Sequence, residues 1–187
     1  MTKNLPLQKP MLWLAGLSAI FLLITGIVAI LGLTIDPQYE NQYSITVPIN
    51  RAKLWQVLTA PEKKALWDGQ IERTEQLSHS GETNSSDQPS RWKDIYANQT
   101  EINYSIKADE TSLSIVRKVD DPNLPIHFSW AISLQDANSN TRVRILEQGQ
   151  VGNPIVRYLV SNWVGDDIFA KRFIEQLERL SDRELRE

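Results

Sequence analysis

The feature that most constrains this chain is an uncharged, apolar run near its N-terminus. From Met11 to Ile35 there are 25 residues without Asp, Glu, Lys, Arg or His. As a helix rising about 1.5 Å per residue, the run is about 37 Å long, enough to cross a hydrocarbon core of about 30 Å with some tilt. Pro10 precedes the run and Asp36-Pro37 follows it. The run therefore predicts one transmembrane helix over residues 11–35.

Two other interpretations of the run fit less well. A cleaved signal peptide has an apolar core of about 7–15 residues and a small-residue cleavage site, and a buried core helix normally keeps a polar face. Lys3 and Lys9 precede the span, whereas Asp36 and Glu40 follow it, and Lys and Arg near a span mark its cytoplasmic side. We expect a single-pass membrane protein with a cytoplasmic tail over residues 1–10 and an exported C-terminal domain.

The chain beyond the span is acidic. After Ile35 there are 18 Lys and Arg residues against 23 Asp and Glu, a net charge of −5. Nucleic-acid binding needs clustered basic residues, so we expect no nucleic-acid partner. The absence of cysteine excludes thiol nucleophiles and Cys-type zinc sites. His79 and His127 lack the spacing of metal ligands, and no nucleotide-binding or hydrolase motif is present, so the sequence predicts neither a metal nor a cofactor.

A domain over residues 42–187 is expected to follow a linker at 36–41. Asn50 and Pro61 begin two short helices, and the polar stretch Ser78–Ser90 predicts a long hairpin loop. Alternating apolar and polar residues predict antiparallel strands. The alternation is centred on Tyr43–Val47, Gln70–Leu77, Trp92–Tyr96, Ile102–Ile106, Leu113–Ile115, Phe128–Leu134 and Val143–Ile145.

The last part of the chain predicts a long helix. Asn153 before Pro154 is typical of a helix start, and Gly165 predicts a kink or a short break. A sheet with one apolar face needs a cover, and this helix is the largest element available. Its periodic positions are Ile155, Leu159, Asn162, Asp166, Ala170, Phe173, Leu177 and Leu180.

The order of these elements resembles the START-like superfamily, also called SRPBCC, in its polyketide cyclase/dehydrase and lipid-transport group. The similar stretches are VPINRAKLWQVLTAPEKKALW, NTRVRILEQGQ and DIFAKRFIEQLERL, and the resemblance covers Gln42 to Asp182. Two departures are the long loop at Ser78–Ser90 and a reduced turn at Trp67-Asp68-Gly69.

The resemblance implies an α+β helix-grip fold. In this fold a curved antiparallel sheet of about six or seven strands surrounds the long C-terminal helix, with a cavity between them. Here the fold follows one transmembrane helix. Some bacterial members are similar in having a single N-terminal span, which implies a bacterial inner membrane with the domain extracytoplasmic.

Aromatic residues supply most of the candidate cavity wall. Ligand pockets are mostly apolar with a few polar anchors, although ordinary core packing is the alternative for each aromatic residue. Glu147 interrupts the apolar pattern of its strand, so it either anchors a ligand or a cation, or a bulge turns it to solvent; Asp94 raises the same question. The candidate ligand-binding residues are Tyr104, Phe128, Trp130, Ile132, Glu147, Trp163, Phe169 and Phe173.

These features predict a membrane-anchored module that binds a lipid-like or other hydrophobic small molecule. One alternative is an interaction domain whose cavity is filled by its own side chains. Another is a cyclase-like or hydrolytic enzyme that uses Glu147 and tyrosines as acid and base. The volume of the cavity separates the first hypothesis from the second.

Overall fold

The computed structural model describes the chain apart from residues 1–7, 78–88, 120, 123, 166–167 and 185–187. The chain forms two compact units, which are described separately below. One consists of Gln38–Gln150 with Asp166–Glu187, and the other of Met1–Pro37 with Val151–Gly165. Nearly all of the predicted loop at Ser78–Ser90, with His79, lies outside the described residues, as does Asp166.

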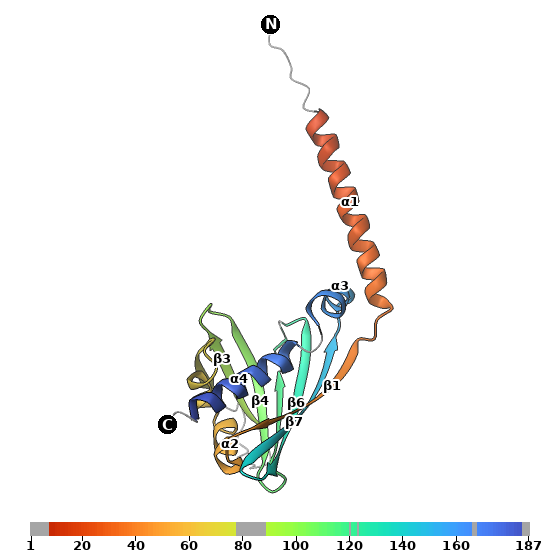
Figure 1. Cartoon of the computed structure of the whole chain (residues 1–187). Helices are drawn as coiled ribbons and strands as arrows, with labels where there is room; N and C mark the ends of the chain where they lie inside the picture. Colours follow the sequence, from red (N-terminus) through yellow and green to blue (C-terminus); the bar gives the residue numbers. More distant parts are fainter. Residues whose placement is uncertain (1–7, 78–88, 120, 123, 166–167, 185–187) are drawn as a thin grey trace. The chain divides into compact units, whose positions relative to one another are not determined.

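The larger unit is built on one seven-stranded sheet in the order β1-β7-β6-β5-β4-β3-β2 (Figure 1). The registered strand pairs are antiparallel, so the predicted fold class is confirmed. The strands are β1 (Gln38–Val47), β2 (Ile71–Gln76), β3 (Ser90–Tyr96), β4 (Glu101–Asp109), β5 (Ser114–Val119), β6 (Ile126–Ala137) and β7 (Asn140–Val151).

The sheet begins earlier in the chain than the sequence predicts. The expected linker at 36–41 is largely the start of β1, which pairs with β7 from Gln38 onward. Tyr39 lies opposite Gly149, and a Cβ atom at that glycine would come within 2.2 Å of the tyrosine ring. Gly149 therefore leaves room for an aromatic side chain over the end of β7, which the alternation from Tyr43 onward does not reveal.

Two short helices follow β1, as predicted. The Asn50 side chain caps α2 (Arg51–Leu58) by accepting a hydrogen bond from the Ala52 backbone N–H at 2.9 Å. The second is a 3-10 helix, η1 (Pro61–Leu66), with proline in its first turn. The unexpected feature of η1 is Lys64, whose side chain is buried and donates a hydrogen bond to Asp94.

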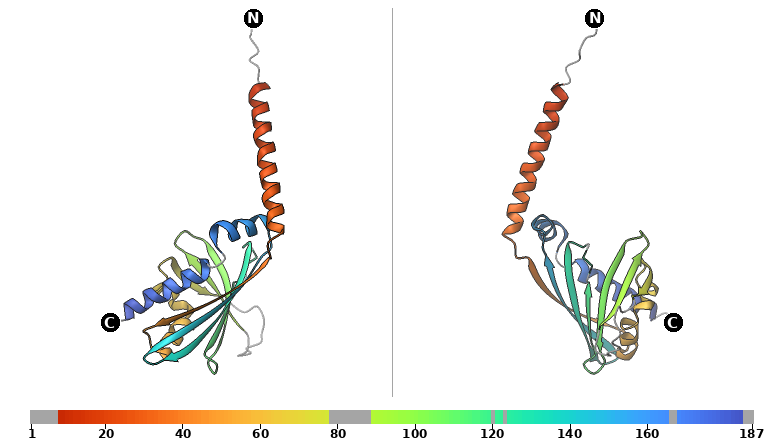
Figure 2. Two further views of the ribbon diagram at one scale, coloured as in Figure 1. Left: turned by 45° about the vertical axis from the view of Figure 1, so that its right-hand side comes forward. Right: turned by 180° about the vertical axis from the view of Figure 1, so that it is seen from behind.

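Helix α4 (Ile168–Glu184) covers one face of the curved sheet (Figure 1 and Figure 2). Its buried apolar residues follow steps of three and four, which places them on one side of the helix. This is the helix-grip arrangement, and it leaves the core between α4 and the sheet. The buried apolar residues of α4 are Ala170, Phe173, Leu177 and Leu180.

The smaller unit contains α1 (Gln8–Leu33), α3 (Pro154–Leu159) and the π-helix η2 (Val160–Val164). The segment Trp13–Leu33 has a mean hydropathy of 2.6 and is not buried. By length and composition it fits a membrane span or a signal sequence. The predicted break at Gly165 is confirmed: this residue has a φ of 85° and ends the helical segment that begins at Pro154.

Candidate functional site

A cavity of about 330 Å³ lies between the sheet and α4 in the larger unit. Residues of η1, β3, β4, β5, β6 and α4 contribute to it, with the segments that follow η1, β3 and β5. The wall has an apolar side and a polar side. The apolar side consists of Ile102, Val119, Leu124, Pro125, Ile126, Phe128, Trp130, Phe169 and Phe173.

Aromatic rings from β6 and α4 meet across the apolar side. Phe128 stacks on Phe169 with 4.5 Å between ring centroids, and Trp130 stacks on Phe173 at 5.2 Å. Strand alternation places Phe128 and Trp130 on one face of β6, while a spacing of four places Phe169 and Phe173 on one side of α4. Offset aromatic pairs of this kind form a rigid apolar surface.

A buried charge cluster adjoins these rings: Arg117 on β5 pairs with Trp130 on β6, and its guanidinium lies 5.7 Å from the centroid of the Trp130 ring. Asp94 on β3 is fully buried and accepts hydrogen bonds from Lys64 Nζ at 2.5 Å and Arg117 Nη2 at 2.8 Å. Thr74 donates to its other carboxylate oxygen at 3.0 Å. The Arg117 guanidinium also lies over the Tyr104 ring, 4.0 Å from its centroid. Asp94 therefore has two cationic partners, and both of them also line the cavity.

Burial and charge shift the proton equilibria of this cluster. Burial, followed by the charge of Arg117, lowers the pKa of Lys64 to about 7, although Asp94 acts in the opposite direction. Burial alone would raise the pKa of Asp94, but Lys64 and Arg117 hold it below its ordinary value. Burial raises the pKa of Tyr104. Asp94 thus stays ionised and Tyr104 neutral near pH 7, where Lys64 gains or loses its proton.

The cavity wall carries more positive than negative groups. Lys64, Arg117 and Arg172 line it, whereas Asp68 is the acidic residue among its described lining residues. Arg172 forms a salt bridge with Asp68, with 3.4 Å between Arg172 Nη2 and Asp68 Oδ1. Trp130 is 8% exposed, and its Nε1 has no hydrogen-bond partner within the described part of the chain, nor does Arg117 Nε. Such a wall suits a ligand group that is negatively charged and accepts hydrogen bonds.

Six of the eight predicted site residues lie between the sheet and α4. Phe128, Trp130 and Phe169 line the 330 Å³ cavity. Tyr104 and Ile132 instead line an adjoining void of about 20 Å³. Phe173 lines both spaces.

Glu147 and Trp163 are placed elsewhere. Glu147 is fully buried on β7, where Tyr39 Oη donates to its Oε1 at 3.1 Å, and the register of β1 with β7 shows no bulge. The bulge alternative is therefore wrong, and Glu147 is not among the residues that line the cavity. Trp163 is 81% exposed on η2 in the smaller unit. The break at Gly165 separates it from α4, so helical spacing across that glycine did not apply.

Sequence reasoning missed the cationic residues of the site. Lys64 belongs to the Lys63-Lys64 pair and Arg117 to the Arg117-Lys118 pair, and such charged pairs are usually solvated. A signal was nevertheless present for Arg117, because it shares strand parity with Ile115 and Val119, which are buried. The buried Asp94 supplied the second signal, since a carboxylate facing the core needs a cation or donors.

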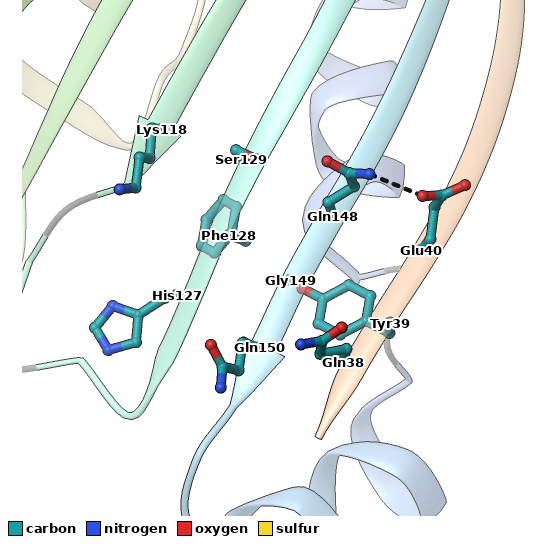
Figure 3. Close-up of a pocket in the computed structure, with 10 residues that line it drawn as sticks. All are labelled: Gln38, Tyr39, Glu40, Lys118, His127, Phe128, Ser129, Gln148, Gly149 and Gln150. Carbon is teal, nitrogen blue, oxygen red and sulfur yellow. Dashed lines mark hydrogen bonds between the residues drawn. The ribbon is translucent and has the colours of Figure 1, made fainter. Parts of the chain in front are cut away.

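A second hollow, of about 470 Å³, lies over β1, β7, β6 and β5. Figure 3 shows polar side chains around it, including Gln148 donating to Glu40 at 2.8 Å. Its lining residues Lys118, His127 and Gln150 are exposed. This hollow is larger but open and polar, so it lacks the enclosed apolar wall typical of a small-molecule site.

No family model matches the chain, and no curated protein matches it. Several solved structures resemble it in fold. The structure of Ara h 8.0201 matches with 10% sequence identity and a TM-score of 0.60, over 80% of this chain and 99% of that one. The di-domain ARO/CYC protein BexL of the BE-7585A biosynthetic pathway matches with 11% identity and a TM-score of 0.60, over 77% of this chain and 45% of BexL.

A norcoclaurine synthase point mutant from Thalictrum flavum, solved in complex with a transition-state analogue, also matches. It has 11% identity and a TM-score of 0.56, over 79% of this chain and 96% of the synthase. At these identities the likeness shows the fold alone. The sheet closed by α4 is a START/Bet v 1-like fold, as the resemblance implied.

Proposed function

We propose that this protein is a membrane-anchored module that binds an amphipathic small molecule. The apolar body of the ligand lies against the aromatic rings of β6 and α4, and an acidic head group reaches Lys64 and Arg117. The observation that carries this proposal is the 330 Å³ cavity, whose wall combines aromatic rings with the buried cations Lys64 and Arg117. Its volume is at the lower end of the range of about 300–1,000 Å³ for ligand pockets, which favours a compact ligand.

The chemistry of the polar side supports an acidic head group. Lys64 and Arg117 both donate hydrogen bonds to the one carboxylate of Asp94, so a ligand carboxylate would meet two cations that share a single hydrogen-bonded counter-ion. The unpaired N–H groups of Trp130 and Arg117 are donors that a carboxylate could satisfy. A neutral apolar molecule could occupy the same cavity, but it would accept no hydrogen bond from the N–H groups of Trp130 and Arg117.

The cavity also bears on the two alternative functions. An open volume of this size favours ligand binding over an interaction domain filled by its own side chains. The enzyme hypothesis relied on Glu147, which lies beside Tyr39 and does not line the cavity. The structurally similar norcoclaurine synthase was solved with a bound transition-state analogue, which supports ligand binding as a use of this fold without indicating a reaction here.

The anchor is supported by α1. The segment Trp13–Leu33 is uncharged and unburied, and it is long enough to span a bilayer. An anchored domain samples a high local concentration of molecules dissolved in the membrane. Lys3 and Lys9 before the span favour a cytoplasmic N-terminus, with the binding domain outside the cytoplasm, as in a bacterial inner membrane.

The binding proposal is tested with full-length protein in lipid nanodiscs. The probe is naphthalene-2-carboxylate, and its affinity is measured by calorimetry against empty nanodiscs. We expect saturable binding at micromolar concentrations, and loss of that binding in Phe173→Ala, which removes part of the wall. The matched control is Arg144→Ala, an exposed residue of β7, which should bind like the wild type. Equal heats from loaded and empty nanodiscs would contradict the proposal.

The anchor is tested separately by mass and extraction. The purified membrane protein should retain the full mass of 21.4 kDa and resist alkaline extraction from membranes. A shortened chain in the soluble fraction would instead identify the N-terminal run as a cleaved signal. A reporter fused after Glu187 should be active only outside the cytoplasm, and cytoplasmic activity would reverse the orientation.

A further inference from the structure

The smaller unit carries most of the exposed apolar surface of the described residues. Fourteen of their sixteen exposed large hydrophobic side chains belong to it, twelve on α1 and two beyond β7. Those two are Leu159, which is 39% exposed, and Trp163, which is 81% exposed. They are four residues apart, so they lie on the same side of the α3–η2 segment. Exposed apolar residues that gather on one side of an element mark a site of interaction with a protein or a membrane.

Arg157 ties this segment to the C-terminal end of α1. Its guanidinium donates to the carbonyl oxygens of Gly32 at 3.2 Å and Ile35 at 2.9 Å, and to those of Val151 at 3.0 Å and Gly152 at 3.2 Å. Gly32 lies in the last turn of α1, and the positive charge of Arg157 is favourable at the negative end of the helix dipole. Arg157 is the one charged residue in the sequence PIVRYLVSNWV, and all its other residues are uncharged.

The approach of the two segments is close. A Cβ atom at Gly32 would come within 1.8 Å of the Pro154 carbonyl oxygen. Only glycine therefore allows the last turn of α1 to contact the first turn of α3 in this way. Gly32 and Arg157 together hold α3 against the end of the apolar helix, in the same compact unit as the exposed side chains of Leu159 and Trp163.

We infer that α3–η2 lies in the lipid headgroup region, with Trp163 and Leu159 inserted at the boundary of the acyl chains. This inference rests on the anchor in the proposed function, because it needs α1 to span the bilayer. If α1 spans, its C-terminal end lies at the membrane surface, and Arg157 and Gly32 hold α3 at that depth. Tryptophan is enriched at this interface because its ring is apolar and its N–H is polar.

The experiment uses the natural absence of cysteine in this chain. Full-length Trp163→Cys is labelled with the fluorophore NBD and reconstituted in phosphatidylcholine vesicles. Some of the lipid carries a nitroxide quencher, either near the glycerol end or near the middle of the acyl chain. Two labelled variants serve as references: Leu22→Cys, in the middle of α1, and Ser161→Cys, an exposed polar position of η2 two residues from Trp163.

We expect NBD at position 163 to emit at shorter wavelength than in water, and to be quenched more by the shallow label than by the deep one. Position 22 should be quenched more by the deep label, and position 161 weakly by both. If position 22 is quenched but position 163 emits as in water with neither label effective, the inference fails while the anchor stands. If position 22 is not quenched either, the anchor itself fails, and the inference with it.

Discussion

The two sides of the cavity are built in different ways. The aromatic side consists of pairs of residues from two long elements, β6 and α4, in which a regular spacing places Phe128 beside Trp130 and Phe169 beside Phe173. The charged side brings together single residues from η1, β3 and β5, namely Lys64, Asp94 and Arg117. In the proposed function, the aromatic residues hold the apolar body of the ligand, whereas the charged residues select among molecules that fit.

The first prediction concerns the aromatic side and is the largest effect on stability. Phe173→Ala should lower the free energy of unfolding by about 3–5 kcal/mol, because the ring is 3% exposed and packs on Trp130. The substitution should weaken the binding of naphthalene-2-carboxylate and that of its uncharged analogue naphthalene-2-carboxamide to a similar extent. The measurements are urea denaturation and calorimetry in parallel. A change in selectivity between the two probes would mean that the two sides of the cavity are not separate.

The second prediction concerns the carboxylate that the two cations share. Asp94→Asn should lower the free energy of unfolding by about 3 kcal/mol, since it removes the carboxylate that forms ion pairs with both buried cations, Lys64 and Arg117. Asp68→Asn is the matched control, because its partner Arg172 is 38% exposed and the pair is weaker. If both variants lowered the free energy of unfolding equally, the burial of the cationic partners would not determine the loss of stability.

The third prediction separates charge from shape at the polar side. Lys64→Met keeps a side chain of similar length, and Asp94 keeps Arg117 and Thr74 as partners. Affinity for naphthalene-2-carboxylate should fall by about tenfold or more, as for a lost charged hydrogen bond of roughly 1.5–3 kcal/mol. Affinity for the carboxamide should hardly change. A parallel loss for both probes would assign Lys64 a structural role only.

The fourth prediction follows from the lowered pKa of Lys64. Asp94, Arg117, Asp68 and Tyr104 face this amine, and Lys64 is the group that titrates near pH 7. A bound carboxylate favours the protonated amine, so affinity should fall as the pH rises above about 7, by up to about tenfold per pH unit. Calorimetry in buffers of different ionisation enthalpy should show proton uptake on binding. Lys64→Met should abolish that uptake, and uptake that persists would exclude Lys64 as its source.

Lys64 also makes folding itself pH-dependent. Its folded pKa is about 7, below the unfolded value, so the unfolded state binds more protons between about pH 7 and about pH 10.5. The contribution of this residue to stability therefore rises with pH across that window. Urea denaturation of the wild type and of Lys64→Met over the window isolates this contribution from those of other groups.

The smallest expected effect comes from the unpaired indole N–H. Trp130→Phe keeps an aromatic ring against Phe173 but removes Nε1, which has no partner within the described residues. Carboxylate affinity should fall by about fivefold, as for one neutral hydrogen bond of about 1 kcal/mol. Carboxamide affinity should fall less, because its oxygen carries less charge. An unchanged affinity for both probes would place the head group away from Trp130.

The difference between the two sides also explains what could be predicted from the sequence. Strand alternation and helical spacing predict the seven strands, α4, and the wall residues Phe128, Trp130, Phe169 and Phe173, because these patterns repeat within one element. Trp163 was expected on the helix that covers the sheet, but the positive φ of Gly165 ends its helical segment before α4 begins.

The charged side has no such repeat. Its residues come singly from η1, β3 and β5, and in the sequence Lys64 and Arg117 look like ordinary surface charges. For Asp94 the sequence raised the question of an inward carboxylate, but nothing local indicates that Lys64, 30 residues earlier, is its partner. Glu147 shows the same limit, since strand parity left open whether it faces the core or solvent and did not indicate the contact with Tyr39, 108 residues away.

The most direct test of the account is the affinity of the wild-type protein for two probes of equal shape. Naphthalene-2-carboxylate and naphthalene-2-carboxamide differ in charge at one position, and the cavity has cations beside an aromatic wall. The account predicts that both bind, and that the carboxylate binds more tightly by about tenfold or more at about pH 6, where Lys64 is protonated. Equal affinities would contradict the selection by charge, and the absence of binding by either probe would contradict the ligand-binding function itself.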